Sequence, residues 1–311
     1  MKISREEWED IFKSAYRGEV KFGAAMRDYT NLGIGGPADV LVYPADPVSV
    51  KNIVLLAGRK GIPLRTLGGG TNVLVSDEGI EGIVMNLNSF RMLHVIREEA
   101  DEIEVFAEAG LPLQMLVNFC REKGYSGAEG LTGIPGTLGG AICGNAGSYG
   151  YELSNVIQSV LIMSADGKLD RVDAGNLGFG YRRSAIKPDD IILNASLKLR
   201  MDDKDAVADR IQGYLNEKKK VQPLSARSAG CVYKNPEGET AGKLIDAAGC
   251  KGMKVGGIEV SRVHANFFVN TGGGTGVDYL RLMSEVSAAI ENKFGVILEP
   301  EIRVIGRGFN I

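Results

Sequence analysis

Apolar side chains recur at the helical period in several segments of the chain. Residues 46–61 place them three and four positions apart, with Asp46 at the N-cap position and Pro47 in the first turn, which predicts an amphipathic helix. Residues 5–17 show the same spacing around Trp8. Further helices are expected at 113–124, which ends at a C-cap glycine, at 205–220 and at 278–294.

Other segments are rich in β-branched and aromatic residues, and they predict strands. Residues 156–174 contain two such runs on either side of Asp166 and Gly167, a dipeptide typical of hairpin turns. Residues 38–67 read as a small β-α-β unit. Further strands are expected in several runs between 72 and 110, at 190–200 and in the tail, 298–306.

Two glycine-rich loops interrupt these elements. Residues 131–150, LTGIPGTLGGAICGNAGSYG, hold seven glycines and no charged residue, and residues 67–77 read LGGGTNVLVSD. Backbone N–H groups in tight turns form concave nests that bind anions, phosphate above all. Neither loop has the P-loop or the dinucleotide fingerprint. The loops therefore predict a phosphorylated cofactor held from two sides, with two purely structural turns as the alternative.

Composition narrows the class of protein. The 311 residues are 44% hydrophobic and 24% charged, as in a globular protein of two or three domains. The net charge of -3 lacks the excess of basic residues that is typical of nucleic-acid-binding proteins. The charged N-terminus does not read as a signal peptide, and no apolar run is long enough to span a membrane, so we expect a cytoplasmic protein. No CxxC pair occurs and no metal site is expected; the cysteines are Cys120, Cys143, Cys231 and Cys250.

Three strings together resemble one enzyme family. GIPGTLGGAICGNAGSYG at 133–150, LGGGTN at 67–72 and NLGIGGPAD at 31–39 are similar to the UDP-N-acetylenolpyruvoylglucosamine reductases, flavoenzymes that share their flavin fold with the vanillyl-alcohol-oxidase group. The resemblance runs from about Tyr29 to Gly306. It implies an α+β fold: a two-part FAD-binding domain, 1–66 with the tail 299–311 and then 67–204, followed by an α/β substrate-binding domain, 205–298.

The resemblance also implies the reaction. NADPH reduces FAD, and hydride then passes to the vinyl carbon of UDP-N-acetylglucosamine enolpyruvate, which yields UDP-N-acetylmuramate for peptidoglycan synthesis, cell shape and division. No histidine or cysteine lies in 67–77 to attach the flavin, so FAD should be noncovalent. A monomer is expected. The cofactor contacts carried over are Gly68, Gly69, Gly70, Thr71, Asn72, Gly133, Ile134, Pro135, Gly136, Gly139, Gly140, Asn145, Ala146 and Gly147.

The family places an arginine and a glutamate on the enolate-like intermediate. The matching residues are Arg182 in GYRRSAI and Glu301 in LEPEIRVIG. A guanidinium can bind a carboxylate or enolate oxygen through a forked pair of hydrogen bonds. Strand alternation would turn Glu301 and Arg303 to one side of the tail strand. Without the resemblance, a solvated arginine and an ordinary strand acid would be the simpler interpretations.

The proton donor is where the chain departs from the family. Most relatives carry serine in this motif, whereas SAGCVYKNP places Cys231 at that position. A thiol, whose ordinary pKa is about 8.5, can also donate a proton. The alternative is that Cys231 is a small buried hydrophobe.

Five residues resemble substrate contacts. Lys234 and Asn235 belong to the same string as Cys231, and Tyr149 ends the long glycine-rich loop. Arg227 and the run Lys218 to Lys220 could meet the diphosphate, although such a run is more often a solvated helix end. His264 is a pocket residue or a structural histidine.

Two other functions compete with the reductase. One is an oxidase on the same flavin fold, and the other is a flavin- or nucleotide-binding regulator without catalysis, which only the change at Cys231 favours. Some relatives carry a tyrosine-bearing insertion soon after the catalytic arginine. The segment after Arg182, RSAIKPDDIILNASLKL, has no room for it, so the chain resembles the shorter class.

Overall fold

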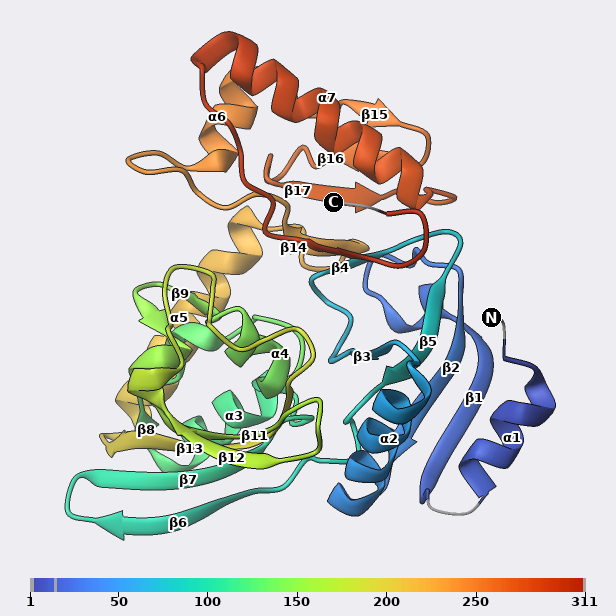
Figure 1. Ribbon diagram of the computed structural model, residues 1–311. Helices are drawn as coiled ribbons and strands as arrows, with labels where there is room; N and C mark the ends of the chain where they lie inside the picture. The colour runs from blue at the N-terminus through green and yellow to red at the C-terminus, as the bar shows by residue number, and fades with distance from the viewer. Residues whose placement is uncertain (1–2, 14–15, 310–311) are drawn as a thin grey trace. The chain divides into compact units, whose positions relative to one another are not determined.

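The computed structural model describes residues 3–13 and 16–309 (Figure 1). They form two compact units, each built from separate stretches of chain. The first unit is Met1–Ala24, Asp39–Gly69 and Gly82–Leu215, and the second is Ala25–Ala38, Gly70–Glu81 and Asn216–Ile311. The expected domain limits at 66, 204 and 298 stay a prediction.

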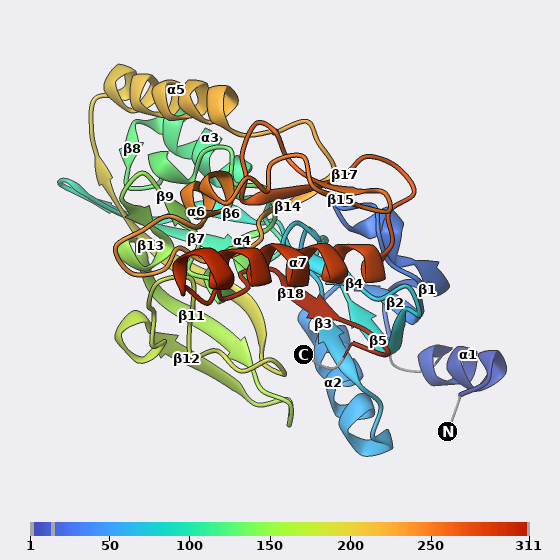
Figure 2. The ribbon, with the colours of Figure 1, turned by 90° about the horizontal axis from the view of Figure 1, so that it is seen from above.

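The first unit contains most of a four-stranded sheet in the order β1-β2-β5-β3. Helix α2 (Pro47–Lys60) lies along this sheet (Figures 1 and 2). As predicted, Asp46 caps it by accepting a hydrogen bond from the Ser49 N–H, 2.7 Å away, and Gly61 ends it at φ 63°. The strands are β1 (Gly18–Ala25), β2 (Pro37–Pro44), β5 (Ile80–Met85) and β3 (Leu64–Thr66).

The larger sheet of this unit has the strand order β12-β11-β13-β7-β6, with β8 paired to β13. The predicted hairpin at Asp166 and Gly167 joins β11 to β12. The apolar side chains of β7, β11 and β13 form one core with α2 and α3 (Leu113–Lys123). The strands are β6 (Leu93–Glu99), β7 (Glu102–Glu108), β8 (Tyr125–Ser126), β11 (Ile157–Met163), β12 (Leu169–Asp173) and β13 (Ile191–Met201).

The second unit has an antiparallel sheet in the order β14-β17-β16-β15 and a two-stranded parallel sheet, β18-β4. Helix α7 (Gly276–Phe294) lies against β15 and β16, and in Figure 2 it is the long red helix. The remaining elements are β4 (Val73–Val75), β14 (Ser228–Cys231), α6 (Ala241–Ala247), β15 (Lys254–Val255), β16 (Ile258–Val260), β17 (Phe267–Asn270) and β18 (Arg303–Ile305).

Several element boundaries differ from the prediction. Helix α1 (Arg5–Lys13) buries Trp8 and Phe12 as expected, but residues 16–17 are not helical and 14–15 lie outside the described residues. Strand β3 is shorter than the expected 62–67, and the tail strand is reduced to β18. Strand β1 was not predicted: Glu19, Val20, Lys21 and Phe22 do alternate between polar and apolar, but the alternation is short and every side chain of the strand is half-exposed or exposed.

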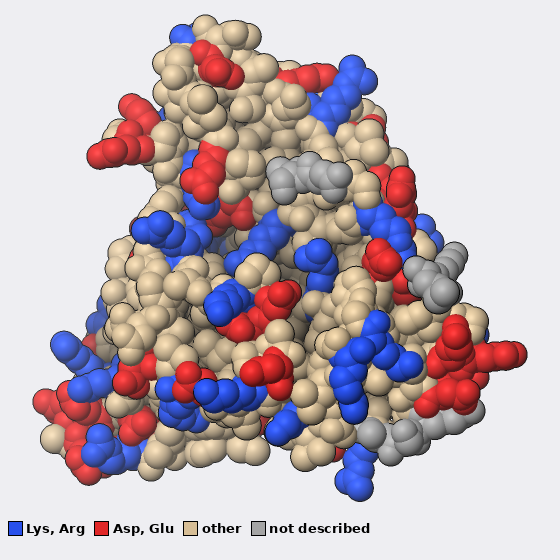
Figure 3. All heavy atoms as spheres, viewed as in Figure 1, with Lys and Arg blue, Asp and Glu red and all other residues tan. Residues whose placement is uncertain are grey.

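Charge is mixed on the face of the molecule shown in Figure 3, where acidic and basic side chains are interspersed. Within residues 3–13 and 16–309, none of the helices combines the length and the apolar character that crossing a bilayer requires.

Candidate functional site

In the first unit, the two glycine-rich loops approach each other closely. The Gly68 carbonyl accepts a hydrogen bond from Nδ2 of Asn86 at 3.1 Å. A Cβ added at Gly68 would lie 2.5 Å from Oγ1 of Thr137, at the start of α4 (Leu138–Cys143). The structure therefore brings residues of both predicted cofactor loops together, and the close approach explains the need for glycine at 68.

Backbone strain concentrates around the longer loop. Four described non-glycine residues have positive φ: Ala100 at 48°, Asn145 at 42°, Tyr149 at 55° and Arg182 at 54°. Ala100 lies in the turn between β6 and β7. The other three were predicted as site residues from the sequence. Such conformations cost roughly 1–3 kcal/mol each and cluster at functional sites.

Asn145 ties the glycine-rich loop to the segment that carries Arg182. Its side chain is fully buried. Nδ2 donates to Oε2 of Glu152 at 2.9 Å and to the Gly180 carbonyl at 3.1 Å, and Oδ1 accepts from the Ser154 N–H at 2.9 Å. Both amide hydrogens are therefore used within the protein. A contact from Asn145 to the cofactor would have to come from its oxygen atoms.

Arg182 reaches back to the same loop. Its Nη2 donates to the Gly147 carbonyl at 2.7 Å, and its guanidinium carbon lies 5.2 Å from the centre of the Tyr181 ring. The backbone of Gly180 pairs with that of Arg183, which makes a tight turn around Arg182. The side chain is half-buried. Arg182 thus keeps its charge at the edge of the glycine-rich loop rather than in bulk solvent.

In the second unit, the rest of the shorter loop packs on the chain end. A Cβ at Gly70, whose φ is 64°, would lie 1.9 Å from the Tyr29 carbonyl oxygen, so only glycine fits. Nδ2 of Asn72 donates to the Glu301 carbonyl at 3.1 Å. Oδ1 of Asn72 is buried and has no hydrogen-bond partner within the described part of the chain. An unsatisfied acceptor here fits a bound group with hydrogen-bond donors, as the ribityl chain and isoalloxazine of FAD have.

Backbone pairing places Cys231 and Glu301 on neighbouring segments. The Glu301 N–H donates to the Val232 carbonyl at 2.8 Å, and the Lys234 N–H donates to the Glu299 carbonyl at 2.8 Å. Glu301 precedes β18, so its expected place within the tail strand was wrong. The expected alternation nevertheless agrees with burial, since Ile302 is only 4% exposed whereas Glu301 is half-buried.

A pocket of about 330 Å³ opens beside Cys231. Asn235 and His264 also line it, so three of the predicted site residues share one cavity. Burial, and after it the charge of Lys251, lower the pKa of His264, which favours a neutral ring at pH 7. Charged side chains that line the same cavity are Lys243, Asp246 and Lys251. Neither lysine was predicted from the sequence; their only signal was their place in the glycine- and alanine-rich run AGKLIDAAGCKG.

The other predicted substrate contacts are spread over the two units. Tyr149 belongs to the first unit and Arg227 to the second, where Arg227 lies against Gly33. Nζ of Lys234 pairs with Oε1 of Glu299 at 2.5 Å. In the basic run 218–220, Lys218 is only 3% exposed, whereas Lys219 and Lys220 are exposed. The alternative interpretation, a solvated helix end, therefore fits Lys219 and Lys220 but not Lys218.

Comparison with known proteins covers both units. The family of the UDP-N-acetylenolpyruvoylglucosamine reductase C-terminal domain matches residues 222–305, and the FAD binding domain family matches residues 38–173. The reductase of that name from Geotalea uraniireducens (strain Rf4) is 38% identical over 94% of this chain and 96% of its own length. The one from Rubrobacter xylanophilus is 43% identical over 92% and 95%.

A solved structure of a reductase of the same name also matches nearly the whole chain. The crystal structure of UDP-N-acetylenolpyruvylglucosamine reductase from Thermus caldophilus matches with a TM-score of 0.79 and 34% identity. The match covers 93% of this chain and 99% of that one.

Proposed function

Because the chain belongs to the UDP-N-acetylenolpyruvoylglucosamine reductase family, we propose that it reduces UDP-N-acetylglucosamine enolpyruvate to UDP-N-acetylmuramate with NADPH and bound FAD. The fold is α+β, with an FAD-binding domain of the vanillyl-alcohol-oxidase type and an α/β substrate-binding part. The observation that carries the proposal is the pairing of the Cys231 and Glu301 segments beside the pocket that Cys231, Asn235 and His264 line. The three-domain division, the monomeric state and the cytoplasmic location belong to the same proposal.

The glycine-rich loops would hold the cofactor. Gly68 lies close to Thr137, and Asn72 has a buried acceptor without a partner among the described residues, which fits a polar cofactor at these loops. When bound, FAD supplies the hydride that NADPH has delivered. The proposed contacts are the glycines and neighbours predicted from the sequence, 68–72, 133–136, 139–140 and 145–147.

Three residues would carry the chemistry of the substrate. Arg182 binds the oxygen on which charge develops, through its forked N–H groups. Glu301 holds the same end of the substrate by hydrogen bonding. Cys231 gives its thiol proton to the substrate carbon and becomes a thiolate. Around them, Tyr149, Arg227, Lys234, Asn235 and His264 would bind the UDP-sugar.

An anaerobic titration tests the proposal. The purified protein should be yellow, NADPH should bleach it, and UDP-N-acetylglucosamine enolpyruvate should restore the colour without oxygen. Fast recolouring by air alone, with no response to the sugar, would instead indicate an oxidase. If NADPH does not bleach the protein, a flavin-binding regulator without catalysis would be the better interpretation. Acid precipitation should release all colour into the supernatant, because the attachment is noncovalent; colour retained in the pellet would contradict that part.

A further inference from the structure

Tyr149 is held in an unusual conformation by a helix distant in sequence. Its φ of 55° lies in the left-handed region, which is rare for a bulky aromatic residue, and its side chain is 36% exposed. The ring stacks on that of Tyr214 in α5 (Lys204–Val221), with centroids 4.5 Å apart and planes 13° from parallel. The Tyr149 hydroxyl also points to the Tyr214 carbonyl at 3.4 Å.

Tyr214 is itself fixed from a second direction. The Tyr151 ring meets its edge, with centroids 6.0 Å apart and planes at 68°. Tyr149 and Tyr151 are joined by Gly150 in a short hairpin, in which Ser148 pairs with Tyr151. One ring of α5 therefore contacts both aromatic side chains of this hairpin.

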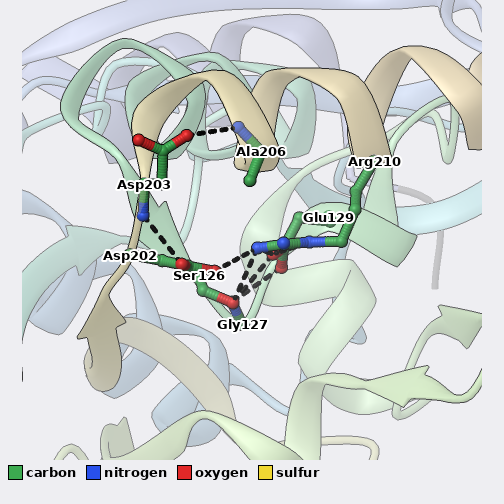
Figure 4. Close-up of polar contacts among 7 residues, drawn as sticks. All are labelled: Ser126, Gly127, Glu129, Asp202, Asp203, Ala206 and Arg210. Carbon is green, nitrogen blue, oxygen red and sulfur yellow. Dashed lines mark hydrogen bonds and ion pairs between the residues drawn. The ribbon is translucent and has the colours of Figure 1, made fainter.

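One face of α5 is also bound to the chain just before the glycine-rich loop 131–150. Arg210 lies four positions before Tyr214, on the same helical face. Its Nη2 lies 2.8 Å from Oε1 of Glu129 and 2.5 Å from Oδ2 of Asp202, and Figure 4 shows the guanidinium turned toward both carboxylates. Val207 and Ile211 of this face are buried.

Glu129 makes this anchor specific. It is fully buried, and besides Arg210 it accepts hydrogen bonds from Oγ of Ser126 at 2.8 Å and from the Gly127 N–H at 2.7 Å (Figure 4). Charge-assisted bonds of this kind fix geometry more strictly than apolar packing does. Hence α5 contacts Glu129, two residues before the glycine-rich loop 131–150, through Arg210, and Tyr149, at the end of that loop, through Tyr214.

We propose that Tyr214 is a positioning residue of the substrate site, whose ring keeps Tyr149 in the strained conformation that binds the UDP-sugar. The inference rests on the proposed function, because it assigns Tyr149 to the substrate. It deepens that function by placing part of the sugar-nucleotide affinity on a residue that need not touch the ligand. An aromatic stack rigidifies a binding group in advance, and preorganisation of this kind strengthens binding without adding contacts.

The test is single-turnover oxidation of the dithionite-reduced holoenzyme by UDP-N-acetylglucosamine enolpyruvate, measured against sugar concentration. Tyr214→Leu should weaken the apparent sugar affinity by about tenfold, or about 1.4 kcal/mol, with the limiting rate unchanged. Tyr214→Phe should behave as the wild type, because it keeps the ring. Asp209→Ala, an exposed change on the same helix, is the matched control and should also match the wild type.

A double-mutant cycle shows whether Tyr214 acts through Tyr149. Tyr149→Leu should weaken sugar affinity, and adding Tyr214→Leu should weaken it no further. Additive losses, or wild-type affinity in Tyr214→Leu with only a lower melting temperature, would overturn the inference. If the leucine variant does not fold, Tyr214→Met, which fills a similar volume without a ring, takes its place. A wild-type protein that the sugar does not reoxidise would instead refute the proposed function.

Discussion

The two units hold their proposed catalytic groups by different means. In the first unit, Arg182 is positioned by its own side chain, which donates to the Gly147 carbonyl, and its backbone is strained at φ 54°. In the second unit, Cys231 and Glu301 lie on segments joined by backbone hydrogen bonds, such as that from the Glu301 N–H to the Val232 carbonyl. Substituting Cys231 or Glu301 should therefore leave these backbone hydrogen bonds in place. Substituting Arg182 should remove both its proposed role in the chemistry and a contact that shapes the glycine-rich loop.

The largest expected effect belongs to Cys231. Cys231→Ala should slow reoxidation of the reduced enzyme by the sugar about 10²–10⁴-fold, the usual contribution of a general acid. Reduction by NADPH, FAD content and melting temperature should stay at wild-type values, because the neighbouring backbone pairs do not involve the thiol. Anaerobic stopped-flow separates the two half-reactions.

Cys231→Ser provides the control for this prediction. Serine has nearly the same shape, and the family resemblance implies serine at this position, so substantial activity should remain. A buried structural cysteine predicts the opposite order, with alanine nearly silent and serine more harmful because it buries a hydroxyl. An alanine variant as fast as the wild type would remove Cys231 from the mechanism.

Substituting Arg182 should give the next largest loss of rate, and unlike the Cys231 substitution it should also affect FAD binding. Arg182→Ala should slow the sugar half-reaction about 10²–10³-fold, as loss of a group that stabilises developing charge does. It should also weaken FAD binding, since the Gly147 carbonyl of the predicted cofactor loop loses its partner. Equilibrium dialysis of FAD against Arg182→Ala and Glu301→Gln measures the contrast. Equal FAD affinity in the two variants would contradict the comparison between the units.

The same comparison explains what the sequence could and could not predict. Helix α2 was predicted with its cap, because Asp46, Pro47 and Gly61 act locally. The pairing of the Glu301 segment with the Cys231 segment depends on contacts about 70 positions apart. The family resemblance assigned both residues to the substrate but did not predict that their segments pair. Glu129 was missed, because a lone acid in a glycine-rich run has no sequence signal of burial; its role depends on Arg210 from a distant helix.

The ion pair of Glu129 with Arg210 tests the geometry of the first unit without touching the chemistry. Arg210→Ala should lower the free energy of unfolding by about 3 kcal/mol, since it leaves the fully buried Glu129 carboxylate without its cation. This expected loss of stability is at the low end of the range for buried ion pairs, because the Arg210 side chain is 34% exposed. Urea unfolding measures it. The isosteric Glu129→Gln in the Arg210→Ala background should recover part of the loss, and no recovery would mean that packing, not charge, holds α5 there.

The smallest expected effect is the contribution of His264, in the second unit, to the pH dependence of the free energy of unfolding. Burial and the charge of Lys251 lower the pKa of His264 below its ordinary value of 6.5. The unfolded chain then binds more protons than the folded one as pH falls through 6.5, so the free energy of unfolding should fall with it until the folded-state pKa is passed. Lys243 and Asp246 line the same pocket and add charges of opposite sign. Urea unfolding over a pH series should show this slope in the wild type and in His94→Asn, which changes the chain's other histidine, exposed on β6. The slope should shrink in His264→Asn. Identical pH dependence in all three proteins would show that His264 is not kept neutral by its pocket, and a polar ligand contact from its protonated ring would then be the better assignment.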